Sequence, residues 1–130
     1  MVKLLIMDDE LAVRNALFDM LKPLGHKVFM AESGSQAIAM ARREYFDVTL
    51  LDIRIPDMDG LQVMSELRKI NPNVRCIMLS SLGDVQIAVT AIKQGAVDYL
   101  PKPFKEEDVV KVVADTVQAM FGDDTKSFQP

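Results

Sequence analysis

The chain has 130 residues, of which 49% are hydrophobic and 26% are charged, and this length is typical of one globular domain. Its one cysteine excludes a disulfide framework and a multi-cysteine metal cluster. A net charge of −4 does not attract a phosphate backbone, so we expect no direct nucleic-acid binding by this domain. No apolar run approaches the roughly 18 residues of a membrane span and no signal pattern opens the chain, so we expect a soluble, cytoplasmic protein without membrane contact.

Five short apolar runs along the chain predict β-strands. They cover residues 4–7, 28–31, 48–51, 76–79 and 96–100. The first, third and fourth runs are almost continuously apolar, which is typical of strands buried on both faces in the middle of a parallel sheet. The second run alternates better, starting at Lys27, and favours a half-exposed edge strand.

Stretches with helical periodicity lie between these runs and after the last one. The predicted helices cover about residues 13–24, 33–44, 60–70, 85–94 and 106–121. Gly25 and Gly95 stand at the ends of two of them, where helices commonly terminate. Ser33, Asp59 and Asp84 stand at cap positions, and the first of these begins a capping-box pattern.

Strand and helix therefore alternate five times, with connections too short for a second domain. Consecutive parallel strands joined by a helix form right-handed crossovers, so we expect a doubly wound α/β fold with helices on both faces of an open sheet. Residues 1–121 form this domain in the prediction. Residues 122–130 lack periodicity and are interpreted as a polar tail or the start of an interdomain linker.

Polar side chains follow the predicted strands where each strand ends, and ligands bind at this edge of open α/β sheets. Asp8 and Asp9 follow the first strand, Asp52 the third, Ser80 the fourth and Lys102 the fifth. Adjacent strands are about 4.8 Å apart, so we expect these groups to converge on a single pocket.

Three aspartates in one pocket repel each other, by about 4 kcal/mol per pair at ~4 Å and an effective dielectric constant near 20. A raised carboxyl pKa or a bound cation relieves this repulsion. The all-oxygen ligand set favours a hard ion such as Mg²⁺. With Lys102 as a fixed cation and the Ser80 hydroxyl as a donor, the pocket suits a phosphoryl group, and a carboxylate within it can act as a nucleophile that forms an aspartyl-phosphate.

Four segments that carry these residues resemble the signature of bacterial response-regulator receiver domains of the CheY-like type. They are DDE at 8–10, LDIRIPDMDG at 51–60, MLS at 78–80 and YLPKPF at 99–104. The resemblance covers roughly residues 1–121 in order and spacing. It implies a flavodoxin-like, five-stranded parallel sheet of order 2-1-3-4-5 with five helices.

The resemblance also implies the roles of the acidic residues. Asp52 is expected to accept a phosphoryl group from the phosphohistidine of a sensor histidine kinase. Asp9, Asp52 and the backbone carbonyl of Arg54 are expected to ligate Mg²⁺ directly, and Asp8 to hold a metal-bound water. The domain is then a switch that catalyses only its own phosphorylation and dephosphorylation, and not an enzyme with a separate substrate.

The remaining residues of the signature are expected to carry the switch. Lys102 pairs with the phosphoryl oxygens in this scheme, and its bond to Pro103 is usually cis in the family. Ser80 moves to hydrogen-bond the phosphoryl group and Tyr99 turns inward. Arg54 occupies a position where family members vary and where the residue sets how fast water removes the phosphoryl group.

The segment 83–100 resembles receivers of the nitrogen-regulation type (NtrC-like), which precede ATPase and DNA-binding domains. This likeness implies an output domain in a longer transcription regulator, although a free-standing receiver stays open. A homodimer through the fourth and fifth helices is a family-level expectation.

Two alternatives concern the acidic residues. Asp8 and Asp9 have the ordinary use of capping the first helix. Asp57-Met58-Asp59 imitates the D-x-D motif of Mg²⁺-dependent aspartyl-phosphate phosphatases and phosphotransferases of the haloacid-dehalogenase type, but that class needs the motif after its first strand. The adjacent turn residues favour a loop and a helix cap here.

A flavin or nucleotide carrier on the same fold needs a Gly-rich or Ser/Thr-rich phosphate loop after the first strand, where this chain is acidic.

Overall fold

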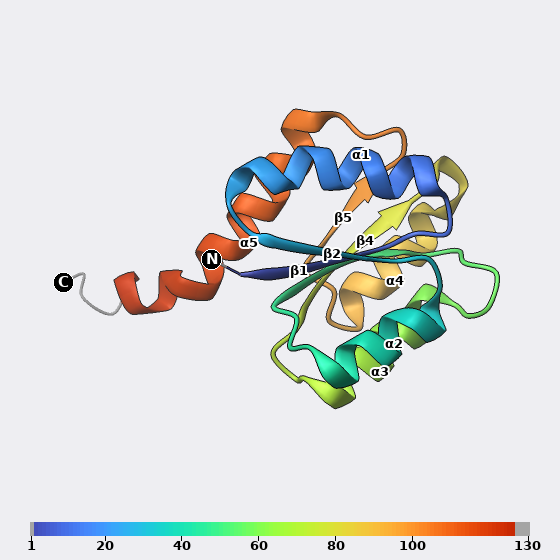
Figure 1. The fold of residues 1–130 in the computed structure, drawn as a ribbon, viewed down its shortest axis with the longest axis horizontal. Coiled ribbons are helices and arrows are strands. Elements are labelled where there is room, and N and C mark those ends of the chain that lie inside the picture. Colours follow the sequence, from blue (N-terminus) through green and yellow to red (C-terminus); the bar gives the residue numbers. More distant parts are fainter. Residues whose placement is uncertain (1, 127–130) are drawn as a thin grey trace.

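The structure, a computed structural model, describes residues 2–126, with side chains through residue 121. Within this part of the chain, five parallel strands form one sheet of order β2-β1-β3-β4-β5 (Figure 1). The strands are β1 (Lys3–Met7), β2 (Lys27–Ala31), β3 (Val48–Asp52), β4 (Arg75–Ser80) and β5 (Asp98–Pro101). The predicted strand order and the predicted edge position of the second strand are confirmed.

Five α-helices in the described residues connect the strands and cover the sheet. They are α1 (Leu11–Leu21), α2 (Gly34–Arg43), α3 (Gly60–Ile70), α4 (Val85–Lys93) and α5 (Glu106–Lys126). Helices α1 and α5 lie on one face of the sheet, and α2, α3 and α4 lie on the other (Figure 1). The doubly wound α/β fold is therefore the observed one.

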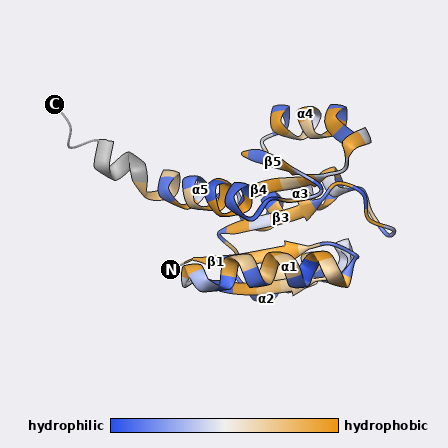
Figure 2. Ribbon diagram, turned by 90° about the horizontal axis from the view of Figure 1, so that it is seen from above, coloured by the Kyte–Doolittle hydropathy of each residue, from blue (hydrophilic) through white to orange (hydrophobic). Residues whose placement is uncertain are grey.

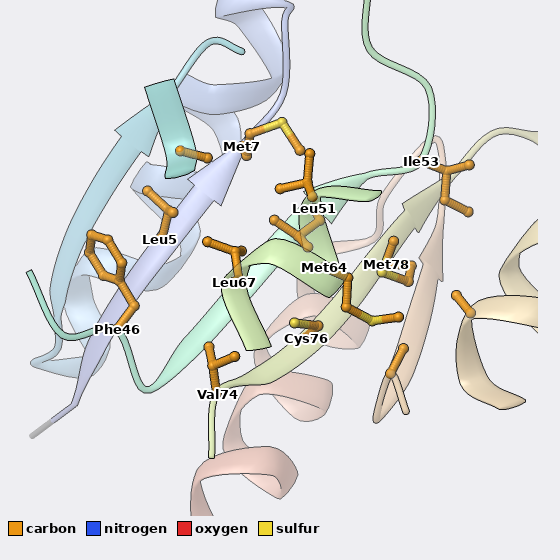
Figure 3. Close-up of a cluster of buried hydrophobic side chains, with 14 of the residues drawn as sticks. Leu5, Met7, Phe46, Leu51, Ile53, Met64, Leu67, Val74, Cys76 and Met78 are labelled. Carbon is orange, nitrogen blue, oxygen red and sulfur yellow. The ribbon is translucent and has the colours of Figure 1, made fainter. Parts of the chain in front are cut away.

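Two apolar layers hold the helices against the sheet. The central strands β1, β3 and β4 are hydrophobic along most of their length (Figure 2), and their apolar side chains alternate between the two layers. Leu5, Met7 and Met78 point into the layer beneath α2, α3 and α4 (Figure 3), whereas Leu17 and Val113 belong to the layer beneath α1 and α5. Each fully buried large apolar side chain contributes about 1.5–3 kcal/mol, so these layers provide most of the driving force for the fold.

The first helix ends earlier than its apolar spacing predicts. Helix α1 stops at Leu21, and a 3-10 turn over Lys22–Leu24 follows, with Gly25 at a φ of 89°. Pro23 has no N–H to donate to an α-helical hydrogen bond, so the chain tightens into the shorter turn before the glycine redirects it.

Side-chain caps begin the two helices whose starts are most clearly marked in the sequence. Ser33 Oγ accepts the N–H of Gln36 at 3.1 Å, and the Gln36 side chain accepts the N–H of Glu32 at 2.7 Å, one residue earlier than the capping-box pattern predicts. Asp59 and Gln62 form a complete capping box at the start of α3. Both helices therefore begin where the predicted caps stand.

Helix α4 begins at Val85 as predicted, but its cap and the start of the following strand differ from the prediction. The prediction that Asp84 caps this helix is wrong, because its carboxylate makes no capping hydrogen bond and instead accepts from Arg54 Nε at 2.6 Å. Strand β5 begins at Asp98 rather than at residue 96, because the N–H of Ala96 donates to the carbonyl of Ala91 at 2.9 Å and closes the end of α4.

Helix α5 continues to Lys126, past the domain boundary expected at residue 121. The shorter prediction rested on the lack of hydrophobic periodicity after residue 121, but a helix that is already nucleated can extend into such a sequence. The rest of the predicted tail, residues 127–130, lies outside the described residues. No helix among the described residues is both long and apolar enough to cross a membrane.

Candidate functional site

The carboxyl ends of β1 and β3 bring three aspartates together. The strand register pairs Met7 with Leu51, so the residues that follow them, Asp8 and Asp52, lie side by side. Carboxylate oxygens of Asp8, Asp9 and Asp52 all lie within 4.8 Å of one another. The predicted convergence of these three acids is therefore present in the fold.

Lys102 completes this cluster from the end of β5. Its Nζ lies 2.8 Å from Asp8 Oδ2 and donates a hydrogen bond to Asp52 Oδ2 at 3.1 Å. The Lys102–Pro103 peptide bond is cis, as the sequence resemblance implies. One ammonium group is thus shared by two carboxylates, and the cluster keeps a net negative charge.

The electrostatics of the cluster centre on Asp52, which is 5% exposed. Burial and the neighbouring charge of Asp8 raise the pKa of Asp52 to about 6, although the Lys102 charge and the Arg54 N–H both oppose the shift. Burial lowers the pKa of Lys102, but its contacts with Asp8 and Asp52 outweigh this effect and leave that pKa above its ordinary value. The site therefore contains a carboxylate that is costly to ionise and a firmly protonated lysine.

Asp8 belongs to the acidic cluster, and neither Asp8 nor Asp9 stands at the N-cap position of α1. Its Oδ1 accepts the N–H of Glu10 at 2.9 Å just before α1, while its Oδ2 faces Lys102. Glu10 stands at the N-cap position of α1 but makes no side-chain cap. The alternative use of Asp8 and Asp9 as caps of the first helix is therefore not found, because the Asp8 carboxylate binds the N–H of the N-cap residue and faces Lys102.

The predicted switch residues lie on the two strands beside the acids. Ser80 ends β4; it is buried, and its Oγ has no hydrogen-bond partner among the described residues. Its backbone carbonyl accepts the N–H of Lys102 at 2.7 Å. Tyr99 lies on β5 beside Met78, is half-buried, and packs against the layer beneath α4. An unsatisfied buried hydroxyl next to a cation and carboxylates is available to a ligand in the pocket.

The D-x-D sequence after β3 belongs to helix starts. Asp57 accepts the N–H groups of Gly34 and Ser35, each at 3.0 Å, and the Ser35 hydroxyl at 2.7 Å. Asp59 caps α3. The interpretation of this motif as loop and cap is confirmed. The contact of Asp57 with the start of α2 was not expected.

Sequence reasoning missed the ion pair between Arg54 and Asp84. Arg54 also donates its backbone N–H to Asp52 Oδ1 at 3.1 Å. The two side chains come from loops 30 residues apart. No local pattern marks such a pair, because each residue taken alone is ordinary in its loop.

The oxygen ligands of this cluster are of the kind that a divalent cation needs. Clustered carboxylate oxygens without histidine or cysteine suit a hard ion such as Mg²⁺, which binds through one or two carboxylates and keeps several waters. Asp9 is exposed, whereas Asp8 and Asp52 are buried. These residues fit Mg²⁺.

Comparison with known proteins identifies the family. Residues 4–114 match the response regulator receiver domain family, so the chain belongs to it and is a receiver domain of two-component systems. The transcriptional regulatory protein ZraR of Klebsiella oxytoca is 36% identical over 102 residues, which make up 78% of this chain and 23% of that protein. The probable transcriptional regulator ycf27 of Guillardia theta is 40% identical over 107 residues, 82% of this chain and 42% of that protein. This chain thus spans about a quarter of the length of the ZraR relatives.

Solved structures show the same fold. The receiver domain of NtrX from Brucella abortus is 30% identical, with a TM-score of 0.83 over 88% of this chain and 98% of that one. A longer NtrX structure from the same organism, in complex with ATP, is 28% identical with a TM-score of 0.89 over 97% of this chain and 29% of that one.

Proposed function

We propose that this receiver domain accepts a phosphoryl group on Asp52 and transmits the change to an output domain or partner. The observation that carries the proposal is the position of the Asp52 carboxylate, buried between Asp8 and Lys102 at the carboxyl edge of the sheet. A sensor kinase phosphohistidine is the donor. An Asp52 oxygen attacks the phosphorus as the P–N bond breaks, and that electron pair stays on the imidazole nitrogen.

The acidic residues prepare this attack. Asp9, Asp52 and the backbone carbonyl of Arg54 would hold Mg²⁺, with Asp8 acting through a water, and the ion supplies charge neutralisation for the phosphoryl oxygens. Lys102 keeps Asp52 ionised enough to act as a nucleophile and pairs with the transferred oxygens. Because Asp57 and Asp59 are engaged at helix starts, they do not supply the general acid that a phosphoester hydrolase of the D-x-D class requires.

The buried Ser80 hydroxyl supports the switching step. It lacks a partner in the described residues, and a phosphoryl oxygen on Asp52 would give it one. The movement of Ser80 leaves space that Tyr99 fills, which alters the surface of α4, β5 and α5. That surface would contact an output domain or a second copy of the chain, and residues 122–130 would begin the linker to an output domain that regulates transcription.

Intact mass after incubation with acetyl phosphate tests the proposal. Wild type is expected to gain one Mg²⁺-dependent phosphoryl group that hydroxylamine removes, and Asp52→Asn is expected to gain none. A normal adduct on Asp52→Asn would contradict the assignment of the phosphoacceptor. Turnover of a small phosphoester would instead support the enzyme alternative.

A further inference from the structure

Helix α4 is weakly fixed by its own packing. Of its nine residues only Ala88 and Ala91 are buried and Ile87 packs partly buried against the core, while Val85, Val89 and Ile92 are each at least 40% exposed. Apolar stabilisation scales with buried area, and alanine buries little. The position of α4 therefore depends strongly on the contacts at its two ends.

Two arginines from other elements hold those ends. At the C-terminal end, Arg68 of α3 donates from Nη1 to the carbonyl of Gln94 at 2.7 Å, which is an ordinary use of a cation at a helix terminus. At the N-terminal end, Arg54 Nε donates to Asp84 Oδ1 at 2.6 Å. The contact of Arg68 is remote from the acidic cluster. Arg54, in contrast, also donates its backbone N–H to Asp52.

Asp84 depends on Arg54. Its side chain is 6% exposed, and among the side chains described, those of residues 2–121, Arg54 Nε alone donates a hydrogen bond to its carboxylate. A buried carboxylate without a partner is strongly unfavourable, so loss of the pair requires Asp84 and the first turn of α4 to move toward water.

Arg54 in turn is fixed to the site by its backbone. Its N–H donates to Asp52 Oδ1, and an isolated β-bridge joins it to Asp59 across the loop. A cavity of about 330 Å³ lies between this loop and α4, with Arg54 and Ile87 among its lining residues. Ile55 of the loop and Ile87 of α4 pack against the same apolar layer, and the ion pair adds a polar contact between the loop and the start of the helix.

We propose that Asp84 is a positioning residue of the phosphorylation site, because its ion pair with Arg54 couples the loop after Asp52 to the start of α4. Occupation of Asp52 and the position of α4 then bias each other, since coupling between two sites is reciprocal. The ligand at Asp52 rests on the proposed function, whereas the connection between the loop and the helix does not.

Amide hydrogen exchange of the metal-free, unphosphorylated chain tests the connection. Arg54→Gln and Asp84→Asn are each expected to raise exchange across residues 82–88 by roughly tenfold, and the double variant by no more than either single one. Arg68→Gln, the matched control, should raise exchange only at the C-terminal end of α4. Unchanged exchange at residues 82–88, or additive effects in the double variant, would overturn the proposal.

Mg²⁺ affinity measured by calorimetry distinguishes a positioning role of the Arg54–Asp84 pair from a purely electrostatic effect of the two charges. If the side chains acted only through their charges, Arg54→Gln would strengthen Mg²⁺ binding and Asp84→Asn would weaken it. Positioning predicts that both variants weaken binding by a similar factor, on the order of fivefold, and that Arg68→Gln does not. Opposite changes would overturn the proposal. Failure of wild type to form an acyl phosphate would count against the proposed function alone, because the exchange experiment uses neither phosphate nor metal.

Discussion

Lys102 Nζ lies 3.1 Å from Asp52 Oδ2, and this contact joins residues 50 positions apart in the sequence. The lysine is shared with Asp8, so it compensates only part of the negative charge around Asp52. Burial and the charge of Asp8 therefore raise the pKa of Asp52 to about 6 despite a cation in hydrogen-bond contact. Folding therefore disfavours the ionised form of Asp52, which is the form that would act as the nucleophile.

Stability should depend on the ionisation of Asp52. The pKa rises from 3.8 to about 6 on folding, so the folded state binds this proton more tightly than the unfolded state does. The contribution of Asp52 to stability is therefore fully present below its unfolded pKa and is lost as the pH rises through ~6. Asp52→Asn has no carboxyl group to ionise at this position, so it does not lose this stability. The variant should be more stable than wild type at pH 7 when a chelator removes metal ions.

Urea unfolding at several pH values between 4 and 7 measures this difference. The stability gap between Asp52→Asn and wild type should widen with pH, and added Mg²⁺ should narrow it because the ion binds folded wild type. A gap that stays constant with pH would contradict the raised pKa of Asp52.

Lys102 should control how readily Asp52 reacts. Its charge and hydrogen bond lower the pKa of Asp52, so Lys102→Met should raise that pKa further. When the pKa exceeds the working pH, each additional unit lowers the ionised fraction about tenfold. Labelling by acetyl phosphate at pH 7 should therefore slow, and it should recover partly at higher pH.

The exposed Lys105, in the same loop, provides the matched control, since Lys105→Met changes net charge equally without touching the acids. NMR titration of the Asp52 carboxyl carbon would report the pKa directly. Equal labelling rates for both lysine variants at pH 7 would refute this role of Lys102.

Ser80 should matter for switching and little for folding. Its buried hydroxyl has no partner in the described residues, so Ser80→Ala should change the free energy of unfolding by less than about 1 kcal/mol. Asn71→Ala makes the contrast, because it leaves the buried carbonyl of Phe46 without its donor and should cost about 1–3 kcal/mol.

Hydrogen exchange before and after phosphorylation measures the expected role of Ser80 in switching. Wild type should change exchange over α4, β5 and α5, and Ser80→Ala should not. A full phosphorylation response in Ser80→Ala would show that another residue transmits the signal.

The sequence predicted the fold well because its strongest signals are local. Central strands that are buried on both faces must be apolar throughout, and their carboxyl ends must meet at one edge of a parallel sheet. Asp8, Asp52 and Lys102 could therefore be placed in one pocket from position alone. The early end of α1 was also recoverable, because Pro23 marks it.

The errors concern contacts that depend on how loops meet in space. Asp84 stands at an ordinary cap position, and only the folded chain shows that Arg54 takes its carboxylate. Asp57 was correctly interpreted as a loop and cap residue, yet the helix that it caps lies 22 residues earlier in the chain. A carboxylate in a loop accepts many donors equally well, so its partner cannot be identified before the loops are positioned.

This contact between Asp57 and Ser35 gives a final prediction, which also separates capping from metal binding. Asp57→Ala removes acceptors from two N–H groups and a hydroxyl at the start of α2, and should lower stability at pH 7 by about 1 kcal/mol. Hydrogen bonds from Ser35 and Gly34 lower the pKa of Asp57, so this contribution is present above its unfolded pKa and disappears as the pH falls through the folded value.

Asp115→Ala is the control, since Asp115 forms an exposed helical ion pair with Lys111 and its loss should cost less than about 0.5 kcal/mol. Urea unfolding compares the two variants, and calorimetry compares their Mg²⁺ affinities. Both should bind Mg²⁺ as wild type does, because Asp57 lies outside the cluster of Asp8, Asp9 and Asp52. A large loss of Mg²⁺ affinity in Asp57→Ala alone would revive the D-x-D enzyme interpretation, because a carboxylate engaged only at a helix start contributes nothing to a metal site.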